Sequence, residues 1–270
     1  MFRVLAGEGM KHLLEDWANI SQRIQEAQNL FLFLDYDGTL TPIVSTPDLA
    51  LCPSEVKTAL VKLRDLPKVS LAIISGRSLE DIREKVGVPG IIYVGNHGLE
   101  IENPAGMHKK KLSANRQREY NNIVQTLKES LKEIPGILFE DKGPILTVHF
   151  RNAPTEYFPG IVQVLDETLE KWKDRWNIAY GKMVFEIRPK VDFNKGKAVR
   201  EILGRSATPG ILPIYLGDDQ TDEDAFRILK GKGITVFVGD RRLTLGADYY
   251  LKDSSEVLQF LRRSLEILVD

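Results

Sequence analysis

Residues 30–40 read Leu-Phe-Leu-Phe-Leu-Asp-Tyr-Asp-Gly-Thr-Leu, an apolar run that ends in two aspartates and a glycine. Such a run is typical of a strand that is buried on both faces of a parallel sheet. Asp35 and Asp37 lie on the same side of this strand, and Gly38 permits a sharp turn after it. Open α/β sheets bind ligands at the carboxyl ends of their strands, so the tip of this strand is a candidate site. The structural alternative is an acidic turn that merely closes a buried strand.

The composition is that of an ordinary globular protein. Of the 270 residues, 43% are hydrophobic and 28% are charged, which is enough apolar material for a sizeable core. The formal net charge of -1 gives no basic surface for nucleic acid or membrane. Cys52 is the only cysteine, so no intrachain disulfide can form, and no apolar run approaches the length of a membrane helix. We therefore expect a cytoplasmic enzyme that binds neither nucleic acid nor membrane.

Strands and helices alternate on either side of a central segment. The pattern predicts strands near 30–34, 69–74, 91–94, 211–216, 234–238 and 249–251. Helices are expected from about Ser54, from Ser78 to Gly87, from about Lys195, after Thr221 and at the end of the chain. This alternation predicts an α/β fold with a doubly wound, Rossmann-like parallel sheet. Apolar residues at helical spacing from Met10 to Ala27 predict an amphipathic helix in an N-terminal extension over residues 1–29.

The central segment follows a different pattern. Two amphipathic helices, around 120–134 and 158–176, are each followed by two short strands. We expect a smaller α+β domain over residues 113–187, inserted into a core formed by 30–112 and 188–270. A hinge between two such domains is a natural way to admit and enclose a substrate.

Three further motifs end or follow predicted strands. They are Ser75-Gly76-Arg77, Phe193-Asn194-Lys195-Gly196-Lys197 and Gly217-Asp218-Asp219-Gln220-Thr221-Asp222. Each is ambiguous by itself, because Ser-Gly is a common turn and a lysine in the first turn of a helix is usually a solvated charge. Lys197 competes with Lys195, and Asp222 and Asp224 can also serve simply to favour a helix N-terminus.

Taken in order with the first motif, these segments resemble the haloacid-dehalogenase (HAD) superfamily of phosphatases. The resemblance implies that Asp35 is a nucleophile that forms an aspartyl-phosphate and that Asp37 is the general acid and base. It implies that Ser75 binds a phosphate oxygen and that Lys195 holds the nucleophile and the phosphate together. It also implies a Mg²⁺ ion at Asp35, at the backbone carbonyl of Asp37 and at Asp218, with Asp219 and Asp222 acting through waters or holding neighbours. Hard oxygen ligands suit this ion.

Charged residues in the smaller domain are spaced by two along predicted strands, which places each pair on one face of a sheet. The pairs are Glu140 and Lys142, His149 and Arg151, and Glu186 and Arg188. Such a polar face suits the hydroxyls of a sugar, although charged residues alternate outward on any solvated strand.

With Gly95-Asn96-His97-Gly98-Leu99-Glu100 and the fourth motif, these pairs are similar to the trehalose-6-phosphate phosphatases, whose cap is of the αββ-repeat (C2B) kind. The resemblance implies that Glu140, Lys142 and Glu186 contact trehalose hydroxyls and that Asn96, His97 and Arg188 shape the site. We include Arg77, His149 and Arg151 in the predicted substrate-binding set. An association with a trehalose-phosphate synthase is a further expectation.

Other functions are compatible with the same motifs. One is another sugar phosphatase of the superfamily or a phosphomannomutase, and a second is a non-catalytic phosphosugar-binding module. A pure binder needs no nucleophile with a paired acid, which favours an enzyme. No Gly-x-x-x-x-Gly-Lys-Ser/Thr loop is present, which argues against an ATP-dependent kinase.

Overall fold

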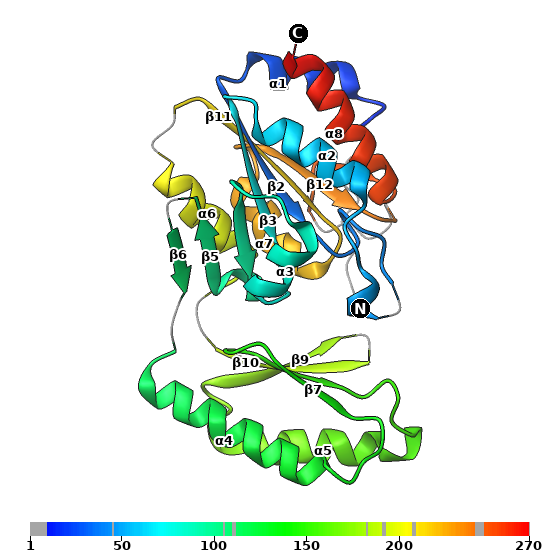
Figure 1. Ribbon diagram of the computed structural model, residues 1–270, viewed down its shortest axis with the longest axis vertical. Coiled ribbons are helices and arrows are strands. Elements are labelled where there is room, and N and C mark those ends of the chain that lie inside the picture. Colours follow the sequence, from blue (N-terminus) through cyan, green and yellow to red (C-terminus); the bar gives the residue numbers. More distant parts are fainter. Residues whose placement is uncertain are drawn as a thin grey trace. The chain divides into compact units, whose positions relative to one another are not determined.

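The computed structural model describes residues 10–44, 46–104, 106–109, 112–181, 183–190, 193–206, 209–240 and 246–269. The chain forms two compact units, residues 1–108 with 193–270 and residues 109–192 (Figure 1). It leaves the larger unit once and returns to it once, so the smaller unit is an insertion between two parts of the larger one.

A nine-stranded sheet forms the centre of the larger unit. In spatial order its strands are β1 (Lys11–His12), β13 (Tyr249–Leu251), β12 (Ile234–Val238), β11 (Ile211–Gly217), β2 (Asn29–Asp35), β3 (Val69–Ile74), β4 (Ile92–Gly95), β5 (Glu100–Asn103) and β6 (Gly106–Lys109). All neighbours from β1 to β4 are parallel, and β5 runs antiparallel to β4. The predicted α/β class with a large parallel sheet is confirmed.

Helices cover both faces of this sheet (Figure 1). They are α1 (Trp17–Glu26), α2 (Ser54–Arg64), α3 (Leu79–Val86) and α8 (Ser254–Val269) on one face, and α6 (Lys195–Arg205) and α7 (Glu223–Leu229) on the other. Strand β2 shows why: Leu30, Leu32 and Leu34 pack on the first face, and Phe31 and Phe33 on the second. A continuous apolar run is therefore a strand that is buried on both sides.

The N-terminal segment differs from the expected helix. Helix α1 begins only at Trp17, because Lys11 and His12 form a strand that pairs in parallel with Tyr249 and Tyr250 of β13. His12 is buried, and its Nε2 lies 2.8 Å from an oxygen of Glu256 on α8. The helical spacing from Met10 onward does not reveal this partner, which lies more than 230 positions away. Residues 1–9 of the predicted extension lie outside the described part of the chain.

The smaller unit is an antiparallel four-stranded sheet with helices on one face (Figure 1). Its strands, in spatial order, are β7 (Leu138–Asp141), β8 (Leu146–His149), β10 (Val184–Pro189) and β9 (Trp176–Gly181). Its helices are α4 (Ala114–Leu131) and α5 (Phe158–Leu169). The expected second helix ends early: after a 3₁₀ turn at Glu170–Trp172 (η4), Trp176 already belongs to β9. The Trp176 ring is buried in the core of this unit, and its Nε1 donates to Glu119 at 2.9 Å.

Strands β5 and β6 were not anticipated, because Glu-Ile-Glu-Asn and its successor contain no apolar run. Within the described residues, no helix is both long enough and apolar enough to cross a membrane.

Candidate active site

Three parallel strands end side by side and carry the predicted motifs. Strand β2 pairs with β3 as far as Asp35 and Ile74, and with β11 as far as Leu34 and Leu216. The segments after these last pairs therefore begin at one edge of the sheet. Asp35, Ser75 and Asp218 come from these three strand ends, as the motif order predicts.

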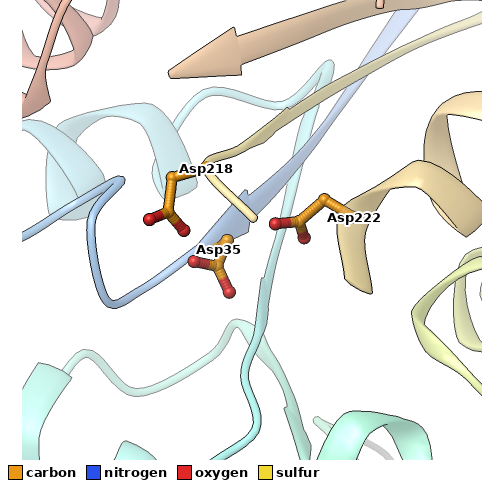
Figure 2. Close-up of side chains that lie close together, drawn as sticks. All are labelled: Asp35, Asp218 and Asp222. Carbon is orange, nitrogen blue, oxygen red and sulfur yellow. The ribbon is translucent and has the colours of Figure 1, made fainter. Parts of the chain in front are cut away.

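Asp35, Asp218 and Asp222 form a cluster of carboxylates (Figure 2). One oxygen of each lies within 4.8 Å of the others. Burial, with the negative charges of Asp222 and Asp218, raises the pKa of Asp35 well above its usual range, although Lys195 acts in the opposite direction. The pKa of Asp218 is raised to about 7, first by burial and then by the charges of Asp219 and Asp222. These carboxylates therefore need more positive charge than they have in the protein alone.

Lys195 is the cation of this cluster and is only 2% exposed. Its Nζ lies 2.8 Å from an oxygen of Asp35 and 2.8 Å from an oxygen of Asp222. Burial lowers its pKa, but the charges of Asp222 and Asp35 outweigh burial, so the net shift is upward. Asn194 caps α6 through a hydrogen bond from the Lys197 amide at 2.9 Å, and Lys195 is the first residue of that helix. Of the two candidate lysines, Lys195 is the one whose ion pairs join Asp35 to Asp222.

Asp222, which the resemblance offered as a residue that acts through waters or holds neighbours, is fully buried beside Lys195. Its Oδ1 also accepts from the Tyr215 hydroxyl at 2.6 Å, and its Oδ2 accepts from the Asp219 amide at 3.1 Å. Burial raises its pKa to about 6, despite the opposing charge of Lys195. Both oxygens of Asp222 are thus engaged by donors, which suits a residue that positions Lys195. Its place at the start of a helix had the simpler interpretation of a helix-capping charge.

Asp219 was predicted as a metal residue, but its side chain turns to the local backbone. Its Oδ1 accepts from the Thr221 amide at 2.8 Å and from the Thr221 hydroxyl at 2.6 Å, which caps the 3₁₀ turn Gln220–Asp222 (η5). Lys195 Nζ lies farther from it, at 3.8 Å. Burial tends to raise the pKa of Asp219, but Lys195 and Thr221 lower it more.

Gly38 fits against Asp218. Its φ is +83°, and a Cβ at this position would lie 2.0 Å from an oxygen of Asp218. Glycine therefore serves both the left-handed turn and the close approach of Asp218 to the first motif.

Arg77 forms an ion pair with both carboxylate oxygens of Asp37. Arg77 Nε lies 2.7 Å from one oxygen of Asp37, and Arg77 Nη2 lies 2.6 Å from the other. Burial lowers the pKa of Arg77, but the bonds and charges of Asp37 and Asp81 raise it more strongly. Ser75 is buried, and its Oγ accepts from the Arg77 amide at 3.1 Å.

Asn96 and His97 lie beside this turn, and both have left-handed backbone conformations, with φ of 50° and 54°. The Asn96 amide donates to the Arg77 carbonyl at 2.7 Å, and the His97 amide donates to the Ser75 carbonyl at 3.0 Å. The Asn96 side chain donates to buried Glu100 at 3.0 Å. A Cβ at Gly76 would lie 2.6 Å from the His97 ring, so that glycine is needed for close packing.

In the smaller unit, one face of the sheet carries five of the six predicted polar residues as a network. Glu140 Oε2 lies 3.0 Å from His149 Nε2 and 3.5 Å from Lys142 Nζ. Lys142 Nζ lies 3.7 Å from Glu186, which is also ion-paired with Arg188. Burial raises the pKa of Glu140, but His149 and Lys142 lower it more.

The register explains this network, since Glu140, Thr147 and Glu186 are direct neighbours across β7, β8 and β10. Arg151 is the exception. It follows β8 in a turn and is exposed.

The chain is similar to known trehalose-phosphate phosphatases. A family model described as trehalose-phosphatase matches residues 33–248. Trehalose-phosphate phosphatase B of Arabidopsis thaliana is 34% identical over 255 residues, which cover 89% of this chain and 67% of the relative. Probable trehalose-phosphate phosphatase 2 of Oryza sativa subsp. japonica is 34% identical over an alignment of 275 positions, which covers 92% of this chain and 70% of the relative. The matched region is therefore about two thirds of each relative's length.

Two solved structures match over most of the chain. The trehalose-6-phosphate phosphatase C-terminal domain of C. albicans matches with a TM-score of 0.79 and 23% identity, covering 96% of this chain and 99% of the other, which shows the fold alone. The trehalose-6-phosphate phosphatase of Aspergillus fumigatus matches with a TM-score of 0.67 and 28% identity, covering 96% and 99%.

Proposed function

The chain belongs to the trehalose-phosphatase family, and we propose that it releases phosphate from trehalose 6-phosphate by way of an aspartyl-phosphate on Asp35. The family predicted from the charged pairs of the smaller domain, residues 95–100 and the fourth motif is confirmed, as is the HAD fold predicted from the four motifs. The observation that carries the mechanism is the buried contact between Asp35 and Lys195, at the sheet edge where Asp218 also lies.

The proposed reaction has two steps on this chain's own residues. An oxygen of Asp35 attacks phosphorus, the bond from phosphorus to the sugar oxygen breaks, and Asp37 gives that oxygen a proton. Asp37 then takes a proton from a water that attacks the aspartyl-phosphate, so that phosphate leaves and Asp35 is restored. Lys195 holds the Asp35 oxygen in place, and the Ser75 hydroxyl binds a phosphate oxygen.

The donor set fits Mg²⁺. Asp35 and Asp218 offer hard oxygen atoms, and one lysine cannot balance the carboxylates of Asp35, Asp218 and Asp222. We propose that Asp35, the backbone carbonyl of Asp37 and Asp218 hold the ion. When bound, it supplies charge neutralisation and positions the phosphate against the nucleophile.

The polar face of the smaller unit is the proposed sugar site. Glu140 on β7, Lys142 just after β7 and Glu186 on β10 present charged donors and acceptors close together, which is the chemistry that sugar hydroxyls need. We propose that the smaller unit, residues 109–192, is the cap expected over 113–187, and that the larger unit, residues 1–108 with 193–270, is the core expected over 30–112 and 188–270. The cytoplasmic location and the association with a trehalose-phosphate synthase stay predictions, the latter testable by mixing the purified proteins and measuring the size of the complex.

The substrate is tested by phosphate release across a panel of sugar phosphates. We expect trehalose 6-phosphate to exceed glucose 6-phosphate and sucrose 6-phosphate in kcat/KM by roughly tenfold or more, since a site with charged hydrogen-bonding groups discriminates strongly. Equal rates would overturn the substrate. Formation of an isomeric sugar phosphate without free phosphate would indicate a mutase instead.

Mg²⁺ should stabilise the folded protein through Asp218. At a concentration about 100 times its Kd, a ligand raises the free energy of unfolding by ~2.7 kcal/mol. In Asp218→Asn this increment should largely vanish, while stability in EDTA should not fall, since the substitution removes a carboxylate crowded by Asp219 and Asp222. Urea unfolding with and without Mg²⁺ measures both quantities.

The matched control for the Mg²⁺ effect is Asp224→Asn. Asp224 lies two residues beyond the end of the same motif, and it pairs with Arg227 at 2.9 Å. This variant should keep the full increment. An undiminished increment in Asp218→Asn would show that Asp218 is not a ligand.

Glu186→Gln should raise KM for trehalose 6-phosphate about tenfold and leave kcat within about threefold, because a charge-assisted hydrogen bond to a hydroxyl contributes ~1.5–3 kcal/mol. 4-Nitrophenyl phosphate lacks the sugar, so its KM should not change. Steady-state kinetics measure KM and kcat on both substrates. Glu167→Gln, on the helix that covers the opposite face of the same sheet, is the control. An equal rise in KM for both substrates would show that Glu186 does not bind the sugar.

A further inference from the structure

Arg77 follows Ser75 and Gly76 at the end of β3, and its side chain reaches the first motif. Each of its three guanidinium nitrogens contacts a carboxylate: Nε and Nη2 contact the two oxygens of Asp37, at 2.7 and 2.6 Å, and Nη1 contacts Asp81 at 2.8 Å. The Arg77 side chain is 10% exposed, whereas the side chains of Asp37 and Asp81 are 44% and 39% exposed. A contact between Arg77 and a substrate phosphate would have to compete with both carboxylates.

The geometry of the pair fixes the orientation of Asp37. A planar guanidinium that meets both oxygens of a carboxylate restricts its rotation, which a lysine cannot do. The Arg77 guanidinium also lies over the ring of Tyr36, 5.5 Å from its centre, and Tyr36 is the residue between Asp35 and Asp37. Arg77 therefore contacts two consecutive residues of the first motif.

Asp81 holds the other side of the guanidinium. It lies in the first turn of α3, and its amide donates to the Ser78 side chain at 3.2 Å, which caps that helix. Lys85 is 3.9 Å from its second oxygen. The helix thus provides a fixed anchor for Arg77, on the side away from Asp37.

We propose that Arg77 is a positioning residue for Asp37, braced by Asp81, rather than a residue that contacts the substrate. The inference rests on the proposed function, in which Asp37 transfers the proton between the sugar oxygen and water. Proton transfer requires the carboxylate to be placed within hydrogen-bond reach of the leaving oxygen, and a displacement of about 1 Å can cost about 100-fold in rate.

A double-mutant cycle tests this inference on the Mg²⁺-loaded enzyme. Asp37→Asn should lower kcat/KM by roughly 10²–10⁴-fold, the usual contribution of general acid catalysis. Arg77→Met should lower it by roughly 10–100-fold in the wild-type background, but by no more than about threefold when Asp37 is already Asn. Arg77→Lys keeps the positive charge and loses the planar guanidinium. Its kcat/KM should lie between that of the wild type and that of Arg77→Met. Losses that multiply across the cycle would overturn the proposal.

Two further readouts separate positioning from substrate contact. The loss in Arg77→Met should be larger for phenyl phosphate than for 4-nitrophenyl phosphate, because only the poorer leaving group needs the proton from Asp37. Competitive inhibition by inorganic phosphate should be unchanged. Weaker inhibition by phosphate, with equal losses on both aryl phosphates, would show that Arg77 binds the phosphate.

Asp81→Asn provides a second variant whose half-exposed position tolerates the substitution, and it should lose activity in the same pattern, about three- to tenfold. Arg83→Met, on the same helix and paired with Glu102 at 3.6 Å, should retain wild-type kinetics. An Asp81→Asn variant with wild-type kinetics would remove Asp81 from the brace. If the wild-type enzyme hydrolyses aryl phosphates and not trehalose 6-phosphate, the proposed substrate fails, and the cycle is still decided on the aryl phosphates.

Discussion

Asp35→Asn is expected to abolish phosphate release, by roughly 10⁴–10⁶-fold in kcat, as the loss of a catalytic nucleophile generally does. An amide is no nucleophile toward phosphorus, yet it keeps the shape of the carboxylate and one oxygen for Lys195. Binding of the phosphosugar should persist in this variant. Phosphate release and mass spectrometry of a rapidly quenched wild-type reaction, which should show the mass of one added phosphoryl group on Asp35, are the two measurements.

The control must be an aspartate of the same region with a different expected role. Asp224→Asn serves again, because Asp224 pairs with Arg227 on α7 and lies outside the carboxylate cluster of Asp35, Asp218 and Asp222. Substantial turnover in Asp35→Asn would show that another group is the nucleophile. A wild-type protein that binds phosphosugar and releases no phosphate would favour the non-catalytic module.

Lys195→Met should be the most destabilising single substitution in the site. It leaves the buried carboxylates of Asp35 and Asp222 without their shared cation, and removing one partner of a buried ion pair typically costs ~3–5 kcal/mol. A like-charge pair at about 4 Å costs ~4 kcal/mol at an effective dielectric of 20, which is of the same size. Urea unfolding in EDTA should show the loss, and added Mg²⁺ should restore part of it.

Activity should fall in parallel, by about 10²–10³-fold, since a preorganised positive charge beside the nucleophile is lost. Lys197→Met is the matched control, because Lys197 is two residues farther along α6, with its amide bonded to the Asn194 cap. It should change neither stability nor kcat appreciably. If Lys195→Met unfolded at the wild-type urea concentration, the buried ion pairs would not contribute as described.

The sequence predicted the sheet and its site because both depend on local signals. Apolar runs such as residues 30–34 mark strands that are buried on both faces, and the residues that follow them must meet where parallel strands end. Lys195 was placed by its resemblance to the lysine of the third motif, at the start of a predicted helix.

What could not be predicted depends on partners far apart in the chain. The side chain of Asp222 turns inward only because a 3₁₀ turn at Gln220–Asp222 precedes α7 and brings it to Tyr215 and Lys195. Arg77 was predicted to bind the substrate, and its contact with Asp37, 40 positions away in the sequence, could not be predicted from local signals. Strand β1 was hidden in the same way, since its spacing matches a helix and only β13 reveals its pairing.

The insertion has a consequence for synthesis on the ribosome. Strand β2 emerges early, but its neighbour β11 begins at Ile211, after the whole of the smaller unit has been made. Residues 109–192 are contiguous and contain a complete sheet with two helices, so this unit can fold before the larger unit has been fully synthesised. Until the later strands arrive, β2 has its neighbour β3 but lacks its neighbour β11. The nascent larger unit is therefore the part that we expect to engage chaperones during translation.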